Sequence, residues 1–450
     1  MKTQRVIYLV DNKRRDLAMA ALIALQLERR GIECQLEPLE SYRAVLAADR
    51  PDLIIFNHLV ASHLVRYSQR LHQEGVLVAV LPNEGILYKE EVLQFNAGRF
   101  HNAAHIDLFF AWNEVFRDAL VAAGMGAQTR IEVVGVPRFD YYFAPWSVRY
   151  APVLRPPRER PLVLVSTNFV FAKYGDLPPE EATELFKDWA RRMESYRDYP
   201  GAVQVSHRNR ERLFAFLETL LGDGRYDVIL RPHPNEEAAW YEQRIAALPA
   251  ALCLRLRLEA ERNITSLILE CDLEISMDSC TTALESWIAG KPTLDLELER
   301  HPLLSNPMLD PLNLRCERPE DLPGLVAAQL ANPTQPEFHD IRAAHLARWC
   351  ASPRGDSAAR VANAIAETLA ARSTTLSLRL TLSDRRRGLK LKALRGLGKP
   401  YNWHPQIGLR AWFNPTGTYI KRRILGKTIT PAEVHEEMEK LRQLPIPGDA

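Results

Sequence analysis

The sequence contains no long hydrophobic run. Its first apolar segment, Val6 to Val10, is short and leads at once into charged residues, so we expect neither a signal peptide nor a membrane span there. No other segment reads as a transmembrane helix. The six cysteines are scattered and form no C-x-x-C pair. These absences predict a cytoplasmic protein with reduced thiols.

Two common cofactor motifs are also missing. No G-x-G-x-x-G follows a predicted strand, which argues against a dinucleotide-dependent oxidoreductase and leaves no visible site for a hydride cofactor. No D-x-D motif, which would bind a metal ion, stands at the end of a predicted strand. The sequence also has no internal repeat of fixed period. We therefore expect a protein that uses neither a bound cofactor nor a catalytic metal ion.

The pattern of the chain predicts two α/β domains. With 450 residues, 46% hydrophobic and 25% charged, it has the length for two or three domains and the composition of a globular protein. Short apolar runs alternate with helical patterns, which is typical of parallel sheets covered by helices on both faces. The predicted strands span 6–10, 33–37, 53–56, 76–80, 108–111 and 131–134 in the first half, and 162–166, 227–230, 251–254, 273–275 and 293–296 in the second.

A proline-rich stretch without periodicity, residues 146–160, separates the two halves. We expect residues 1–145 and 161–372 to form two doubly wound, Rossmann-like domains that face each other across a cleft. Residues 373–450 are expected to form a basic tail. Ligands of such domains bind at the carboxyl ends of the strands.

One informative segment of the second half is residues 271–292, in which a short strand leads through a turn rich in Ser, Thr and Asp into a helix. The start of such a helix offers free backbone N–H groups and a partial positive charge, and hydroxyl groups add further donors. An ordinary capped helix is the alternative. The residues predicted to bind a phosphate there are Ser279, Cys280, Thr281 and Thr282.

The other informative segment is RPHPNE, from Arg231 to Glu236, directly after the strand 227–230. Two prolines hold His233 in an extended conformation, so that its ring projects from a stiff strand end. Such a ring can donate to a phosphate or protonate a leaving group, and a hydrogen-bonded structural histidine is the alternative. Asn235 and Glu236 are expected to cap the next helix. Together the two segments predict a nucleotide-sugar site.

Polar residues also follow strands in the first half. Glu84 follows the strand 76–80 and is the candidate general base that would take a proton from an acceptor hydroxyl; a surface-turn carboxylate is the alternative. Gly85 is expected to allow close approach of a substrate. The loop from Asp11 to Arg14 is expected to cap the next helix through Asp16, with acceptor binding as the alternative.

Two more residues are candidates for contacts to the donor. Arg138 follows the last strand of the first half, where it could meet an anionic donor or pair with Asp140. Asn168 follows the strand 162–166, again at the carboxyl end of the predicted sheet.

The order of these motifs resembles that of a known family. The segments VDNKRRDL, LPNEG, FAWNE, GVPRFD, STNF, RPHPNE and SCTTALESWIAGKP cover about residues 5–300. In this order they are similar to bacterial surface carbohydrate biosynthesis proteins, a branch of the GT-B glycosyltransferase superfamily. The H-P and Ser/Thr elements also resemble bacterial sialyltransferases, capsule polymerases, Kdo transferases and CDP-glycerol glycerophosphotransferases, which use cytidine-nucleotide donors. Single motifs recur in several GT-B groups, whereas their order is specific.

The resemblance implies roles for residues of the second half. His233 would contact the donor phosphate, and Glu285 would bind ribose hydroxyls. Ser279, Thr281 and Thr282 would hold the phosphate or the nucleotide. Since His233, Arg231 and the helix dipole can neutralise phosphate, a metal-independent transfer is implied.

In the first half, the resemblance places Glu84 where sialyltransferase-like members carry their catalytic base. In the surface carbohydrate family an acidic residue often precedes this glutamate, and here Asn83 stands in its place. The chain departs from the family pattern at this position.

The tail has a strongly basic segment. Between Thr381 and Lys427, one acid, Asp384, stands against twelve basic residues: Arg385, Arg386, Arg387, Lys390, Lys392, Arg395, Lys399, Arg410, Lys421, Arg422, Arg423 and Lys427. Leucines and aromatic residues lie between these cations. Such a mixture suits the anionic inner face of the cytoplasmic membrane, where a lipid-linked acceptor would be found. Packing on the acidic body of the protein and nucleic-acid binding are the alternatives, and we expect no nucleic-acid partner.

The sequence therefore predicts a GT-B glycosyltransferase. Its donor would be a nucleotide sugar, a CMP-linked nonulosonic acid or Kdo-type residue, and its acceptor a glycan or lipid-linked glycan of a surface polysaccharide. Two alternatives stay open: an enzyme like the UDP-sugar 2-epimerases, and a non-catalytic assembly protein of the polysaccharide machinery.

Overall fold

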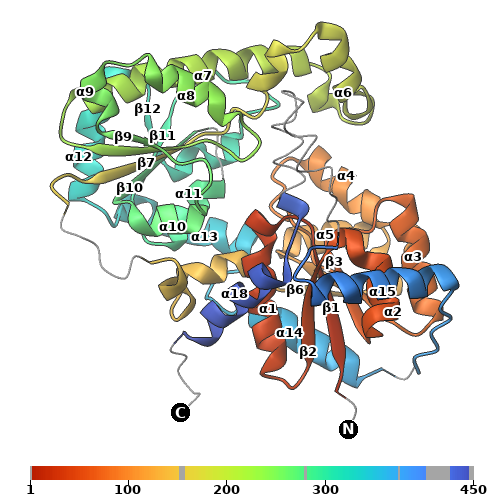
Figure 1. Cartoon of the computed structure of the whole chain (residues 1–450). Helices are drawn as coiled ribbons and strands as arrows, with labels where there is room; N and C mark the ends of the chain where they lie inside the picture. The colour runs from red at the N-terminus through yellow and green to blue at the C-terminus, as the bar shows by residue number, and fades with distance from the viewer. Residues whose placement is uncertain (1–2, 152–157, 278–280, 373–374, 402–425, 445–450) are drawn as a thin grey trace. The chain divides into compact units, whose positions relative to one another are not determined.

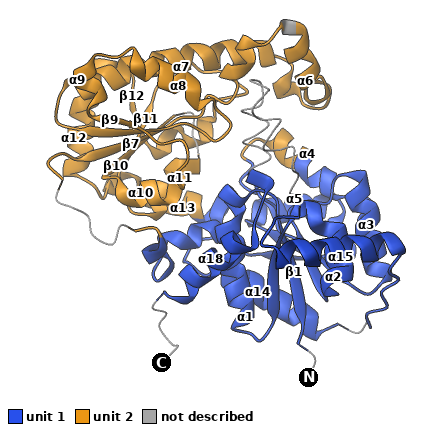
Figure 2. Ribbon diagram, in the orientation of Figure 1, with its two compact units in different colours: residues 1–87, 96–149, 347–450 blue, residues 88–95, 150–346 orange. Residues whose placement is uncertain are grey.

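The chain forms two compact α/β units (Figure 2). The computed structural model describes residues 3–151, 158–277, 281–372, 375–401 and 426–444. Unit 1 comprises residues 1–87, 96–149 and 347–450, and unit 2 comprises residues 88–95 and 150–346. The predicted class, two doubly wound parallel sheets, is confirmed.

Unit 1 contains a parallel sheet (Figure 1). Its six strands have the order β2-β1-β3-β4-β5-β6. Its strands are β1 (Arg5–Val10), β2 (Glu33–Pro38), β3 (Leu53–Phe56), β4 (Leu77–Val80), β5 (Leu108–Ala111) and β6 (Arg130–Val133). Strands β3 and β5 are buried along their whole length, because helices cover both faces of the sheet. The order of strand addition reverses between β1 and β3, which defines the topological switch point of this unit.

Unit 2 contains a second parallel sheet of six strands, in the order β12-β11-β10-β7-β8-β9. Its strands are β7 (Leu162–Ser166), β8 (Asp227–Arg231), β9 (Leu256–Leu258), β10 (Leu273–Met277), β11 (Thr293–Leu296) and β12 (Leu314–Cys316). The switch point lies between β7 and β10, so the carboxyl ends of these two strands flank the crevice in which such sheets bind ligands.

Helices connect the strands in both units. Those with residues in unit 1 are α1 (Ala18–Glu28), α2 (Tyr42–Asp49), α3 (Ser62–Gln73), α4 (Glu90–Phe100), α5 (Glu114–Ala122), α14 (Ser357–Ala370), α15 (Leu382–Gly396) and α18 (Pro431–Arg442). Those of unit 2 are α6 (Pro179–Arg192), α7 (Tyr199–Gly222), α8 (Ala238–Ala246), α9 (Ala250–Cys253), α10 (Ile264–Glu270), α11 (Thr281–Ile288) and α12 (Leu322–Ala331), with most of α13 (His339–Cys350). Among the described residues, no helix combines the length and the apolar character needed to cross a membrane.

The two faces of the unit 2 sheet differ in polarity. Alternate residues such as Val163, Val165 and Ile275 belong to a large apolar core that includes buried residues of α7. On the other face, β10 carries Glu274 and Ser276, both fully buried. Burying polar groups costs free energy unless they have partners, and β10 is the strand that precedes the predicted phosphate turn in the sequence.

One predicted strand is wrong. Residues 251–254 were expected to be a strand, but they lie in and just after the short helix α9, and strand β9 begins only at Leu256. Pro249 stands at the N-cap of α9 in an extended conformation, and alanines follow it. A short apolar run does not distinguish helix from strand by itself, and here the proline and the alanines favour the helix.

The division into units also differs from the predicted boundaries. Helix α14 was expected in the second domain, but the structure groups it with unit 1. The backbone N–H groups of Ser357 and Ala358, at its start, donate to the buried carboxylate of Asp140 at 3.1 and 2.8 Å. The chain therefore returns to the first sheet after the second one is complete.

The described part of the tail packs on unit 1. Helix α15 lies along α2, with Gly388 so close to Ala47 that an added Cβ would be 2.9 Å from the Cβ of Ala47. Arg395 of α15 forms a bidentate ion pair with Asp49 at 2.7 Å, and α18 is bound to α1 by the pair Arg442–Glu28 at 2.8 Å. Intramolecular packing is thus confirmed for α15 and α18. The basic and aromatic residues between 402 and 425 lie outside the described residues.

Candidate functional site

In unit 2, the candidate site is built at the carboxyl ends of three adjacent strands, β10, β7 and β8. Strand β7 ends at Ser166 and leads into Thr167 and Asn168, while β8 ends in the RPHPNE segment. Helix α11 begins after β10. Because the switch point lies between β7 and β10, these loops meet where a doubly wound sheet binds its ligand.

His233 is fixed in one tautomer by the turn that holds it. Its Nδ1 accepts a hydrogen bond from the backbone N–H of Asn235 at 3.1 Å. Burial, together with the charges of Arg231 and Lys173, lowers the pKa of His233 to about 4. The imidazole is therefore neutral near pH 7, and because Nδ1 is an acceptor, the proton is on Nε2. His233 is a hydrogen-bond donor through Nε2, and it is poorly suited to supply a proton as an imidazolium acid.

Glu236 joins the two loops that flank β7 and β8. Its buried carboxylate accepts hydrogen bonds from Thr167 Oγ1 at 2.7 Å, from the N–H of Phe169 at 3.0 Å and from the N–H of His233 at 3.2 Å, and the hydroxyl of Tyr241 donates to its other oxygen. The predicted role of Glu236 as a helix cap is wrong, because α8 starts after it and has no side-chain cap. The residue sets the position of His233.

Two cations border His233. The Nζ of Lys173, a half-buried residue that sequence reasoning missed, donates to the carbonyl of Asn235 at 2.8 Å. Arg231 directs Nη1 to the carbonyls of Ala260 and Pro232, at 2.6 and 3.1 Å. Both cations lower the pKa of His233, so positive potential is concentrated around its ring. An anionic ligand would be stabilised there.

Helix α11 begins at Thr281, and Thr281 and Thr282 are half-buried in its first turn. Glu285, one turn further along, is buried. The other two residues predicted for the phosphate turn, Ser279 and Cys280, lie outside the described residues.

Glu274 lies on β10, the strand that precedes this segment in the sequence, and sequence reasoning did not single it out. Burial raises its pKa to about 8, although the hydroxyl of Thr282 lowers it, and the neighbouring charge of Asp295 raises it further. Glu274 is therefore mostly protonated near pH 7. A neutral Glu274 adds no negative charge near Thr282 at the start of α11, although the charges of Asp295 and Glu285 lie close to it.

Asn168 is half-buried between Thr167 and Phe169, the two residues that Glu236 binds. Its backbone is therefore fixed at the end of β7, beside the switch point.

In unit 1, Arg138 places its guanidinium over the rings of Trp112 and Phe139, at 5.0 and 5.2 Å from their centroids. The alternative, an ion pair of Arg138 with Asp140, does not match the structure. The carboxylate of Asp140 instead accepts hydrogen bonds from two backbone N–H groups at the start of α14.

Glu84 lies in the loop after β4 and is 63% exposed. Its nearest described cation is Arg15, whose Nη1 is 3.9 Å from Oε1 of Glu84.

The loop from Asp11 to Arg14 is occupied by structural contacts: Asn12 caps the following turn, and Lys427 of the tail binds Asp11. The predicted cap through Asp16 is wrong: Asn12 supplies the cap, α1 has no side-chain cap, and the carboxylate of Asp16 accepts from the N–H of Asn12.

Gly85 serves packing and does not serve substrate approach. A Cβ at this position would lie 2.6 Å from the ring of Trp112, and the carbonyl of Gly85 accepts a hydrogen bond from Asn113 at 2.8 Å. The sequence expectation for this glycine is therefore wrong, because its neighbour is a buried tryptophan of the same unit.

Replacing Gly85 with alanine should destabilise the protein by about 1–3 kcal/mol, because the added methyl group displaces the Trp112 ring. Urea unfolding followed by circular dichroism measures the change. Gly98→Ala is the matched control: Gly98 is helical and has open space around it, so that substitution should be neutral or slightly stabilising. Equal stability of Gly85→Ala and wild type would contradict the packing role.

Sequence reasoning missed two residues at the switch point of unit 1. Asn57 and His58 follow β3 directly. Asn57 is only 5% exposed, yet neither its amide nitrogen nor its amide oxygen has a partner among the described residues, and the same holds for Nδ1 of His58. Burial lowers the pKa of His58. Buried polar atoms without protein partners are uncommon in folded proteins, and water, an ion or a ligand can satisfy them. The sequence pattern that could have indicated these residues is the pair of polar residues that follows a fully apolar strand.

Comparison with known proteins identifies the fold. No protein family matches the sequence, and no curated protein matches it either. Among solved structures, a UDP-N-acetylglucosamine 2-epimerase is 14% identical, with a TM-score of 0.51 over 85% of this chain and 100% of its own. The wall teichoic acid polymerase TagF is also 14% identical, with a TM-score of 0.50 over 83% of this chain and 90% of its own.

These similarities, with the two six-stranded parallel sheets, define a GT-B-like fold. At such low sequence identity they concern the fold alone, since one fold carries several reactions. What the protein does must be argued from the side chains at the strand ends.

Proposed function

We propose that the protein is a GT-B glycosyltransferase, one that moves a CMP-linked nonulosonic acid or Kdo-type sugar onto a bacterial surface polysaccharide. The observation that carries the proposal is the neutral His233, which offers an Nε2–H donor within a cationic strand end at the switch point of unit 2. A departing nucleotide phosphate gains negative charge as the glycosidic bond to it breaks. A preorganised donor and a helix start are the groups that stabilise such charge.

In this reaction the acceptor hydroxyl oxygen forms a bond to the anomeric carbon while the bond from that carbon to the phosphate oxygen breaks. Glu84 would take the hydroxyl proton. His233 would donate to the phosphate, and Thr281 and Thr282 would bind it at the start of α11, together with Ser279 and Cys280. Asn57 and His58, at the switch point of unit 1, are suited to bind acceptor hydroxyls, because their polar atoms have no partner among the described residues and are available to a polar ligand.

A thermal-shift panel of CMP, CDP and UDP tests the donor class. Ligand that binds only the folded protein raises its stability by mass action, by about 2.7 kcal/mol at one hundred times the Kd. We expect the cytidine nucleotides to raise the Tm more than UDP does. Absence of a shift with all three would contradict the proposal and favour a non-catalytic assembly protein.

Product analysis tests the reaction class. A transferase should consume a CMP-activated sugar only when a glycan acceptor is present, and it should release CMP in equal amount with the glycosylated product. Conversion of a UDP-sugar to its 2-epimer without any acceptor would instead identify a 2-epimerase.

We further propose that α15 docks on an anionic membrane, where a lipid-linked acceptor resides. Its inner stripe, which includes Asp384, Gly388 and Leu391, is buried against unit 1. Its outer face carries three exposed leucines, Leu382, Leu389 and Leu397, which are 77, 68 and 69% exposed. Exposed cations border them: Arg385, Arg386, Lys390 and Lys392. Apolar side chains between cations suit a surface of anionic lipid headgroups.

Substituting Arg385, Arg386 and Lys390 with glutamine should weaken binding to phosphatidylglycerol-containing vesicles by roughly 100-fold, because each cation contributes about 1 kcal/mol. Point substitutions are preferable to deletion of the tail, since α15 also packs on α2. Vesicle co-sedimentation measures the effect.

Two further variants complete this experiment. Serine at Leu382, Leu389 and Leu397 should also release the protein from vesicles. Leu254→Ser is the matched control, because Leu254 is 88% exposed on unit 2 and should have no effect. Unchanged binding of both α15 variants would contradict membrane docking.

A further inference from the structure

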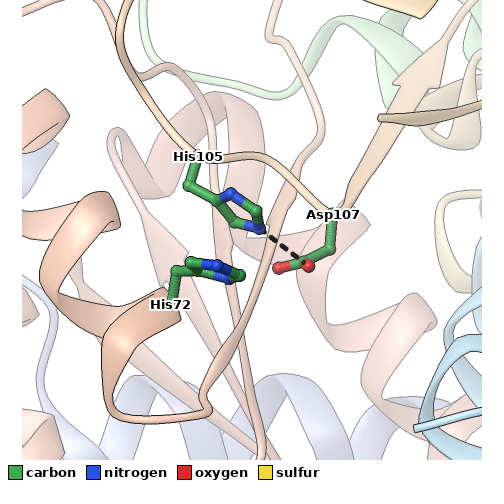
Figure 3. Close-up of side chains that lie close together, drawn as sticks. All are labelled: His72, His105 and Asp107. Atoms are coloured by element: carbon green, nitrogen blue, oxygen red, sulfur yellow. Dashed lines mark hydrogen bonds and ion pairs between the residues drawn. The ribbon is translucent and has the colours of Figure 1, made fainter. Parts of the chain in front are cut away.

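Three metal-ligating side chains converge at the amino end of the unit 1 sheet, the edge opposite to Glu84. His72 lies in the last turn of α3, and His105 and Asp107 precede β5. Ligand atoms from all three lie within 4.8 Å of one another. Figure 3 shows the two imidazole rings one above the other, with the Asp107 carboxylate beside them. His72 lies far in the sequence from the neighbouring residues His105 and Asp107, so no sequence motif indicates the cluster.

The spacing of these atoms fits a metal site. His105 Nε2 lies 3.1 Å from Oδ1 of Asp107. The centroids of the His72 and His105 rings are 3.5 Å apart, with 25° between the ring planes. In a tetrahedral zinc site, bonds of about 2.0–2.2 Å place neighbouring ligand atoms roughly 3.3 Å apart. The distance between His105 Nε2 and Asp107 Oδ1 matches that value, and the ligand atom of His72 lies within 4.8 Å of both. To share one ion with His105, the His72 ring would have to rotate out of the stacked arrangement.

Partners outside the cluster hold two of the ligands in place. Oδ2 of Asp107 accepts a hydrogen bond from the N–H of Val78 at 2.7 Å, which leaves Oδ1 directed at His105. The backbone N–H of His105 donates to Oγ of Ser68 at 3.0 Å. Metal-binding carboxylates and histidines are typically oriented by such outer contacts. His72 is exposed, so an ion has a path of entry and water can complete the coordination.

We propose that His72, His105 and Asp107 bind a first-row divalent transition metal ion, with zinc as the expected ion. Two imidazoles and one carboxylate favour zinc, copper or nickel over magnesium and calcium, which prefer oxygen ligands. The ion would join the end of α3 to the start of β5. It would act on stability, at the edge away from the proposed transfer chemistry, and the inference does not depend on that proposal.

Cobalt and zinc titrations of the full-length protein, without a polyhistidine tag, test the site. Wild type should bind one Co²⁺ with a visible d–d absorption band, lose the band when Zn²⁺ is added, and show a higher Tm with Zn²⁺ than with EDTA. His72→Ala should weaken metal affinity at least about tenfold. It should retain the fold, because it removes an exposed side chain and leaves the pair of His105 with Asp107 intact.

His339→Ala is the matched control. His339 is an exposed histidine 3.3 Å from Asp340, a histidine–carboxylate pair for which no third ligand was found among the described residues. This variant should bind metal as wild type does. Equal affinity of wild type and His72→Ala would overturn the proposal, as would a wild type that binds neither Co²⁺ nor Zn²⁺. Circular dichroism of each variant verifies that the fold is retained.

Discussion

Replacing His233 with asparagine should reduce kcat for sugar transfer by about 10²- to 10³-fold, the loss typical of one removed donor to a developing anion. The asparagine side chain can still provide an acceptor near the Nδ1 position, which in wild type accepts from the N–H of Asn235 at 3.1 Å. It cannot reach the Nε2 position. The turn should therefore stay folded while the donor to the phosphate is lost. Steady-state kinetics with a saturating acceptor measures the effect.

The pH dependence separates a hydrogen-bond donor from a general acid. An acid with the ordinary histidine pKa of about 6.5 would lose activity as the pH rises through that value. The pKa of His233 is lowered to about 4, chiefly by burial, so its protonation state is constant above about pH 5. We expect the ratio of wild-type to His233→Asn rates to be constant from about pH 5.5 to 8. A ratio that falls as the pH rises through this range would contradict the donor role.

Replacing Glu236 with alanine should destabilise the protein by at least about 3 kcal/mol and abolish nucleotide binding. The substitution leaves four donors, from Thr167, Phe169, His233 and Tyr241, without their buried acceptor. Urea unfolding and calorimetric titration with CMP measure the two losses. Glu236→Gln should be intermediate, because its amide oxygen can still accept while its NH₂ group meets other donors.

Glu237→Ala is the control for this pair of variants. Glu237 is exposed, and as the N-cap residue of α8 it makes no side-chain cap hydrogen bond. Its substitution should change stability by no more than about 0.5 kcal/mol. If Glu236→Ala retained wild-type stability and CMP affinity, Glu236 would not be the residue that positions His233.

Sequence analysis placed the residues of the candidate site correctly at the ends of strands. It did not predict the residues that contact them. Two prolines around His233 predicted a ring fixed at a strand end, and the structure places it there. The predicted cap role of Glu236 and the predicted role of Gly85 were wrong, because each depends on a residue distant in the sequence. Glu236 binds Thr167, and Gly85 packs on Trp112.

Asn57 illustrates the same difference. The sequence shows that Asn57 follows an apolar strand. It does not show that the buried amide of Asn57 has no hydrogen-bond partner among the described residues. Only the strand order shows that β3 lies beside β1 at the switch point, and only the packing shows that the buried amide has no partner among the described residues. Burial of this kind cannot be derived from residue types alone.

By itself, the sequence determined that the protein consists of parallel α/β sheets with polar turns at the ends of apolar strands. Hydrophobic periodicity and the conformational preferences of proline, glycine and the capping residues are local, so a short window of sequence contains them. The tertiary structure alone decided which nitrogen of His233 carries the proton and which carboxylate joins the loops after β7 and β8. It also decided that α14, α15 and α18 pack with the first sheet. Hydrogen bonds and burial of these groups join residues far apart along the chain, and they arise only when the chain has folded.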